Sequence, residues 1–335
     1  MKNIVIVVFT ALIAFLVSCR SKNDGIDLSK INLDVKVKRF DLALFDQNIP
    51  SIDVKIDLLS KEYPKFFPLF GERIISIGAI DNPSYSKYLE SFISDKMIIE
   101  SFEKVQDVFP NLDNLNNELT NAFKRFHFYF PQKPIPAIYA YISGFNQSIV
   151  IADSLLGISL DRYLGTNCEY YPRLGIPKYS IHDMHPSKIS SDCIRSWAIG
   201  EFPFNDSIDN LVNNMIYEGT LMYFTKKMLP EQPDSLLFGF TPGQMRWCQR
   251  NEEQMWTYLI ENKMLFITDS FQINKFINGA PFTSGFSQES PGRAVVWLGY
   301  RIVNSFIKKN PNISFQRMMS IRDYQKIFNQ SKYRP

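Results

Sequence analysis

The sequence predicts an α+β protein in which helices dominate and a small sheet precedes one central helix. The central helix is expected at residues 206–230, where apolar residues recur at helical spacing. Asp206 and Ser207 are its candidate N-caps, Lys226 and Lys227 lie in its last turn, and Pro230 stops it. β-branched and aromatic runs gather before it, in residues 134–153. Further segments with helical spacing lie on both sides. Strands that are grouped apart from the helices in this way are typical of the α+β class.

The first residues have the pattern of a bacterial lipoprotein signal. A short positive stretch precedes the apolar residues 4–17, and the apolar run ends in LVSC, which resembles a lipobox. We therefore predict a signal peptide at residues 1–18 and palmitate-type acylation of Cys19. The alternative is a plain secretory signal that is cleaved elsewhere.

After cleavage, the polar residues 19–30 are expected to tether the protein to a membrane of the cell envelope, facing the periplasm. Arg20 follows the lipidated Cys, whereas enteric bacteria use Asp there to retain lipoproteins in the inner membrane, so the outer membrane is favoured. The formal net charge of +3, or +2 once Lys2 is removed, is small and mixed in sign along the chain. This balance argues against nucleic acid as a partner.

The N-terminal half supplies the sheet and several helices. Residues 31–40 alternate apolar and charged side chains, which predicts a strand. Helices are expected at residues 53–63, 85–97 and 112–130. Two β-rich runs, 137–142 and 148–151, flank the turn signal SGFN and predict a hairpin.

Residues 31–335 are expected to form a single domain. No internal repeat, low-complexity segment or Gly/Ser-rich linker divides them. Their length exceeds the ~250–300 residues that one core usually serves, so two subdomains are the alternative. The loop-rich residues 170–191 would then contain the boundary.

The middle of the central helix carries a degenerate zinc-peptidase motif. In the motif H-E-x-x-H, two His bind zinc and the Glu acts as general base on a metal-bound water. Here the residues are YEGTL: Glu218 keeps the base position, while Tyr217 and Leu221 replace the two ligands. A phenol with an ordinary pKa of about 10 is a poor ligand, and Leu221 has no donor atom. The alternative interpretation is an ordinary core helix with a small residue at a crossing point. Without a metal, a partly buried Glu218 would need a hydrogen-bond or charge partner, or would have a raised pKa.

A histidine pair and three cysteines are the other candidate functional residues. His182 and His185 are either a metal pair or two solvated loop residues, and the lack of further ligands nearby in sequence favours the second interpretation. Three cysteines remain besides Cys19, so at most one disulfide can form within the chain. Cys168 and Cys193 are either bridged or, like Cys248, buried thiols.

Helices dominate the rest of the chain. Thr241-Pro-Gly-Gln is a capping box with Pro at the first helical position, and the helix it opens is expected to run to about residue 260. Ser290-Pro opens another helix, which Asn310-Pro ends and in which Gly299 would allow close packing. An amphipathic helix is expected at residues 315–328.

Taken together, these segments resemble the gliding motility lipoprotein GldB family of Bacteroidota. The resemblance rests on the lipobox, the YEGTL helix and five further stretches in matching order: SGFN, GISLDRYLG, TPGQMRWCQRNEEQMW, PGRAVVWLGYRIVNSF and SKYRP. That family is similar to a distant branch of zinc-dependent peptidases, which implies a zincin-like architecture. In such peptidases a second helix supplies a third ligand, often a Glu after an Asn, and Asn251-Glu252 matches that pattern.

The resemblance implies a lipid-anchored envelope protein of the gliding motility or associated secretion apparatus. Because both histidine positions are lost, we expect a pseudo-peptidase that holds or stabilises partner proteins, without catalytic residues, metal or cofactor. Its relict active-site positions would be Tyr217, Glu218, Leu221 and Glu252. The alternative is a metal-dependent hydrolase with non-standard ligands, His182, His185 and Glu218. Their lack of ligand-pair spacing argues against it.

Overall fold

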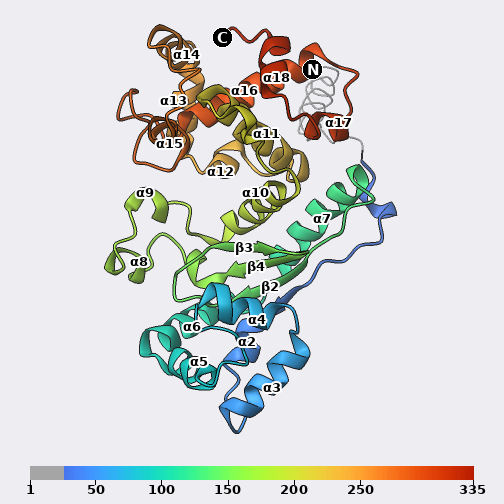
Figure 1. Cartoon of the computed structure of the whole chain (residues 1–335), viewed down its shortest axis with the longest axis vertical. Helices are drawn as coiled ribbons and strands as arrows, with labels where there is room; N and C mark the ends of the chain where they lie inside the picture. The colour runs from blue at the N-terminus through green and yellow to red at the C-terminus, as the bar shows by residue number, and fades with distance from the viewer. Residues whose placement is uncertain (1–25) are drawn as a thin grey trace, which may run out of the picture. The chain divides into compact units, whose positions relative to one another are not determined.

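The computed structural model describes residues 26–335 and divides the chain into two units (Figure 1). The larger unit is Leu33–Pro335. In the smaller unit, Met1–Asn32, the described part contains a short 3-10 helix at Leu28–Lys30, which the side chain of Asp27 caps. The predicted signal peptide and Cys19 lie outside the described residues.

A four-stranded mixed sheet lies before the central helix, as predicted. Its strands are β1 (Val37–Arg39), β2 (Ala137–Tyr141), β3 (Ile149–Ala152) and β4 (Leu155–Ser159). The order is β1-β2-β4-β3. β2 runs parallel to both of its neighbours, whereas β3 pairs antiparallel with β4.

The predicted hairpin has the wrong partners. β2 and β3 are not neighbours, and the hairpin joins β3 to β4 through Asp153 and Ser154, which both have positive φ. The SGFN segment instead folds around a buried carboxylate: Asp161 accepts the backbone N–H of Ser143 at 3.1 Å and that of Phe145 at 2.8 Å. The SGFN and GISLDRYLG stretches therefore meet at one fully buried carboxylate.

The strand expected at residues 31–40 is shorter in the structure, because some backbone N–H groups of this segment bond to side chains of a helix. The backbone N–H of Val35 donates to Thr120 Oγ1 at 3.0 Å, and that of Val37 donates to Asn116 Oδ1 at 2.9 Å. Both acceptors belong to α7 (Asp113–Tyr129). The helix thus holds an extended segment that only partly joins the sheet.

The two faces of the sheet serve two hydrophobic clusters. Ile138 and Ala140 of β2 face the larger cluster, while Tyr139 and Tyr141 face the smaller, aromatic one. The helices of the smaller cluster, coloured blue to cyan in Figure 1, are α2 (Phe40–Leu44), α3 (Ile52–Glu62), α4 (Phe66–Leu69) and α5 (Tyr85–Ser94). The larger cluster contains the central helix and most of the C-terminal helices.

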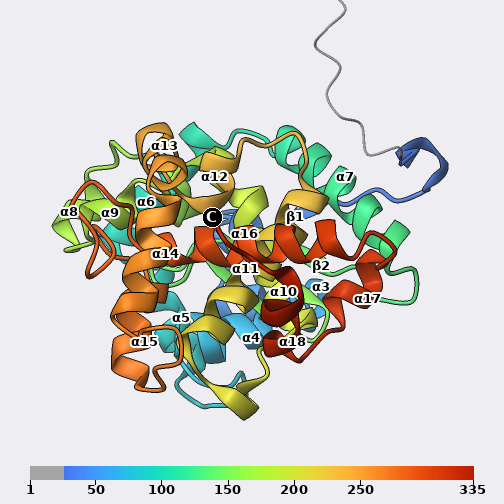
Figure 2. The same ribbon diagram turned by 90° about the horizontal axis from the view of Figure 1, so that it is seen from above.

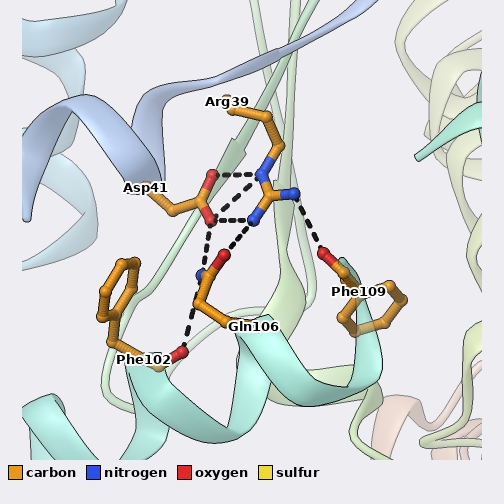
Figure 3. A network of polar contacts seen from close by, with 5 residues as sticks. All are labelled: Arg39, Asp41, Phe102, Gln106 and Phe109. Atoms are coloured by element: carbon orange, nitrogen blue, oxygen red, sulfur yellow. Dashed lines mark hydrogen bonds and ion pairs between the residues drawn. The ribbon is translucent and has the colours of Figure 1, made fainter. Parts of the chain in front are cut away.

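A buried ion pair joins the β1–α2 junction to α6 (Lys96–Val108) (Figure 3). Arg39 donates through Nε to Asp41 Oδ1 at 2.8 Å and through Nη2 to Asp41 Oδ2 at 2.7 Å. The same guanidinium donates to Gln106 Oε1 at 2.9 Å and to the carbonyl of Phe109 at 3.0 Å. Asp41 is fully buried. These charge-assisted hydrogen bonds tie the β1–α2 junction to α6 and its C-terminal end.

In the N-terminal half, α3 and α7 confirm two predicted helices, and the third is interrupted. Helix α5 ends at Ser94, and α6 begins directly afterwards, because the Asp95 carboxylate accepts the N–H groups of Met97 and Ile98 as an N-cap. The prediction missed most of α6. It also missed α10 (Ile189–Glu201), which lies at the end of the region expected to be loop-rich.

The central helix, α11 (Leu211–Met228), starts later than predicted. Its N-cap is Asn210, whose side chain accepts the N–H of Asn213 at 2.9 Å, whereas Asp206–Ile208 forms a separate 3-10 turn. The expected capping residues Asp206 and Ser207 are therefore wrong. The Lys226 and Lys227 end is as predicted.

The C-terminal helices confirm the capping box but divide two predicted helices. Thr241 and Gln244 cap α13 (Pro242–Arg250) reciprocally, and the chain bends at Asn251 before α14 (Glu252–Glu261). The helix predicted to open at Ser290-Pro starts later, as α16 (Ala294–Lys309), with Arg293 as its N-cap. The last predicted helix is two, α17 (Phe315–Met319) and α18 (Tyr324–Ser331). The remaining short helices are α8 (Tyr170–Arg173), α9 (Lys178–Ile181), α12 (Asp234–Phe238) and α15 (Ser270–Ile277).

Candidate functional site

The two positions that zinc ligands would occupy on α11 hold side chains of the hydrophobic core. Leu221 is fully buried. Tyr217 is half-buried and packs against Phe204, with ring centroids 5.1 Å apart, and against Tyr324 at 6.1 Å. Burial, together with the nearby Glu218 carboxylate, raises the pKa of Tyr217 to about 12, so its phenol stays neutral at physiological pH. Neither side chain therefore offers a good metal ligand.

Glu218, in the position of the general base, is held between two arginines. Its Oε2 accepts a hydrogen bond from Arg195 Nη2 at 2.6 Å and another from Arg293 Nη2 at 2.7 Å. The carboxylate side chain is only 12 % exposed. Burial opposes its ionisation, but the two guanidinium groups outweigh burial and lower the pKa of Glu218. Glu218 therefore has two charge partners, Arg195 and Arg293, where the sequence predicted a need for one.

The loop before α16 fixes Arg293 in an uncommon backbone conformation. Arg293 is the N-cap of α16 and has φ +56°, in the left-handed region. The buried hydroxyl of Thr283 donates to the carbonyl of Pro291 at 2.7 Å and accepts the N–H of Ala294 at 2.7 Å. These two bonds bracket Arg293, so the loop is held in the conformation that brings its side chain to Glu218.

A cavity of about 310 Å³ lies beside this clamp, and Arg293, His182 and Asp183 are among its lining residues. Burial raises the pKa of Asp183 and lowers that of His185. The structure brings His182 and Arg293 to the same cavity. It does not gather His182, His185 and Glu218 into a ligand set: within residues 26–335, no group of three or more His, Cys, Asp or Glu side chains is placed to hold a metal ion.

Glu252, the candidate third ligand, belongs to a different network. It opens α14, and its Oε1 accepts from Arg301 Nε at 2.7 Å and from the Tyr333 hydroxyl at 2.6 Å. Burial and the hydrogen bond to Glu252 raise the pKa of Tyr333. The ion pairs of Glu252 and of Glu218 share no residue, so the two relict carboxylates work separately.

Cys168 and Cys193 are not bridged by a disulfide in the described region. Cys168, Cys193 and Cys248 are free and buried. Burial raises the pKa of each thiol, that of Cys248 to about 12. They are therefore packing residues rather than nucleophiles.

Arg195 and Arg293 are the residues of this site that the sequence did not reveal. Arg195 lies on α10, which the sequence pattern did not predict, and Arg293 lies just before α16 in the run PGRA. The sequence indicated only indirectly that such a residue exists, because a buried Glu218 needs a partner. Which of the 37 Lys and Arg residues is that partner depends on the tertiary structure.

Comparison with known proteins gives one match. A protein-family model described as "Gliding motility protein GldB" matches residues 21–335, which include every residue of the site. No curated protein and no solved structure matches the chain. The likeness to zinc peptidases therefore rests on the sequence patterns alone. In the part of the chain that the structure describes, no helix combines the length and the apolar character needed to cross a membrane.

Proposed function

The chain belongs to the gliding motility protein GldB family, and we propose that it is a non-enzymatic, lipid-anchored envelope protein that holds or stabilises partner proteins. Membership of this family implies a role in the gliding motility apparatus. The finer parts of the proposal concern how the protein acts, where it is anchored and what it binds. Each has its own support.

The double ion pair of Glu218 is the observation that carries the non-enzymatic proposal. A general base works best when its pKa lies near the working pH and its carboxylate can reach the proton it removes. Glu218 has a lowered pKa, and two arginines occupy one of its oxygens. Its flanking positions, Tyr217 and Leu221, supply a neutral phenol and an alkyl side chain. This donor set does not suit zinc, which favours neutral imidazole, thiolate and unpaired carboxylate.

Both relict carboxylates instead connect elements of the fold. Glu218 links α11 to α10 and to the start of α16. Glu252 links α14 to the middle of α16 and to Tyr333, beyond the end of α18. Residues in positions that peptidases use for chemistry thus stabilise the scaffold here, which favours a role in binding over one in turnover.

An anchor at Cys19 would place this scaffold at a membrane surface. One acyl chain binds membranes only marginally, so stable attachment needs the additional chains of a fully processed lipoprotein. With the domain beyond the tether, partners would be met in the periplasm. We favour the outer membrane because Arg20, and not Asp, follows the acylated residue.

Affinity capture of the full-length lipidated chain from envelopes tests the proposal. We expect envelope proteins of the motility or secretion apparatus to co-purify in a fixed ratio and to decrease in amount when the chain is deleted. The alternative is the metal-dependent hydrolase. Stoichiometric zinc in protein purified without chelator, with peptide hydrolysis that Glu218→Gln abolishes, would favour that alternative and contradict the proposal.

A further inference from the structure

The C-terminal residues help to form a cavity of about 550 Å³, which is lined by residues from three separate stretches, 249–254, 301–309 and 332–335. Helix α18 ends at Ser331, whose carbonyl accepts the Ser305 hydroxyl at 2.8 Å. Lys332 then adopts a left-handed conformation, φ +46°, and Tyr333 bonds to Glu252. The tail is thus held against α14 and α16 rather than left free.

Positive charge is concentrated in this cavity. Six basic and two acidic side chains line it: Arg250, Arg301, Lys308, Lys309, Lys332 and Arg334 against Glu252 and Glu253. Their net side-chain charge of +4 exceeds the +3 of the whole chain, so all other side chains together carry −1. The charge is therefore a local feature and not a consequence of a basic protein.

Most of these cations have no ion-pair partner in the described part of the chain. Among residues 26–335, only Arg301 of the six is in an ion pair, with Glu252. Its Nε makes that bond, and its guanidinium lies 5.7 Å from the centre of the Trp297 ring. The guanidinium also interacts with the Tyr333 hydroxyl, which bonds to the same carboxylate. Glu252, Trp297 and Tyr333 therefore orient Arg301 at the wall of the cavity.

We propose that this cavity binds a phosphate group carrying at least two negative charges. An oriented guanidinium gives bidentate hydrogen bonds to phosphate, and nearby ammonium groups add charge without demanding one geometry. Asn304 and Ser305 add neutral polar groups to the wall. The cavity is larger than one phosphate requires, so a larger phosphate ester fits. That ester is either a soluble phosphate compound or the headgroup of a phosphorylated lipid.

The test uses the full-length chain in phosphatidylcholine nanodiscs and calorimetric titration with inorganic pyrophosphate. The test variant is Lys308→Glu/Arg334→Glu, which changes two exposed side chains without an ion pair. The matched control is Lys61→Glu/Lys65→Glu, which makes the same charge change at exposed positions around the end of α3. Thermal unfolding of all three proteins shows whether each is folded.

We expect wild type and control to bind pyrophosphate, and the test variant to bind about ten-fold more weakly or worse, because charge-assisted contacts are lost. Binding should weaken as salt is raised. No binding by wild type, or equal loss in test variant and control, would overturn the proposal. Competition by dihexanoyl phosphatidic acid, but not by dihexanoyl phosphatidylcholine, would identify a lipid headgroup as the source. Pyrophosphate binding without such competition would identify a soluble phosphate.

Discussion

Gly219 of α11 and Gly299 of α16 face each other, with no side chain between the two helix backbones. A Cβ atom at Gly219 would overlap the backbone of Gly299, and one at Gly299 would overlap the backbone of Met215. Figure 2 shows α16 crossing α11 in the view from above. The third residue of YEGTL is therefore a packing residue. The small residue at a crossing point, expected if α11 is an ordinary core helix, is confirmed.

Alanine at either glycine should destabilise the protein strongly. Gly219→Ala or Gly299→Ala forces two packed helices apart, so we expect a loss of about 2–4 kcal/mol in the free energy of unfolding. The control is Gly243→Ala in α13, where the nearest atom to an added Cβ, Thr241 Oγ1, is 3.7 Å away. That change should be neutral or stabilising by up to ~1 kcal/mol. Urea unfolding measures all three, and equal effects at the three positions would contradict the close crossing.

Removing the charge of Glu218 should weaken the fold. Glu218→Gln leaves Arg195 and Arg293 close together without a carboxylate, although both remain about a quarter exposed. Because solvent screens them partly, we expect a loss of about 2–3 kcal/mol, below the upper range for buried ion pairs. Glu253→Gln, at an exposed residue, is the control and should change the free energy of unfolding by less than ~0.5 kcal/mol. A Glu218→Gln protein as stable as wild type would show that the clamp is dispensable.

The contribution of Glu218 should also depend on pH in one direction. Its pKa is lowered in the folded protein, so the folded state favours the ionised carboxylate. The stabilisation is then fully present above the unfolded pKa of about 4.3 and is lost as the pH falls through the lower, folded value. We expect the difference in unfolding free energy between wild type and Glu218→Gln to be constant from about pH 6 to 8 and to shrink below about pH 4. A difference that grows on acidification would mean that the folded pKa is raised.

The sequence predicted the ends of elements where the local signal is strong. The capping box at Thr241 fixes the start of α13, and Lys226 and Lys227 mark the end of α11. It failed where the local signal is unusual or lies inside a continuous helical pattern, as at the Asp95 N-cap between α5 and α6. The pairing of β3 with β4 depends on a two-residue turn, Asp153-Ser154, without the usual glycine.

For the site, the sequence predicted the carboxylates but not their partners. The sequence located Glu218 and Glu252, and it showed that Tyr217 and Leu221 are unsuited to zinc. It could not name Arg195, Arg301 or Tyr333 as partners, because those contacts span 23, 49 and 81 residues of sequence. No periodicity or local motif encodes which distant cation will reach a buried carboxylate.

The lipid anchor is tested at Cys19. Cys19→Ala removes the residue that we propose to be acylated, so we expect a protein that is either unprocessed or released from membranes. Membrane fractionation with immunoblotting measures both its length and its location, and Cys168→Ala, at a buried free thiol, is the control. A Cys19→Ala protein that fractionates with membranes at the length of mature wild type would show that attachment does not need this residue.

Restoring the two histidines should not restore a peptidase. Tyr217→His/Leu221→His completes the H-E-x-x-H pattern, but Glu218 stays bound to Arg195 and Arg293, and Glu252 remains in its own network with Arg301. We therefore expect no stoichiometric zinc and no peptide hydrolysis. Burying a polar ring in place of the fully buried Leu221 should also cost about 2–4 kcal/mol.

Elemental analysis, a peptidase assay and urea unfolding measure the three outcomes. Tyr217→His alone is the folding control, because Tyr217 is only half-buried. The triple change with Arg293→Gln frees one side of Glu218 and separates the effect of the clamp from that of the missing ligands. If the double variant binds zinc stoichiometrically and hydrolyses a peptide, the geometry of a zinc peptidase has persisted around α11. The missing histidines alone, and not the arginine clamp, would then account for the lack of catalysis that we propose for the natural chain.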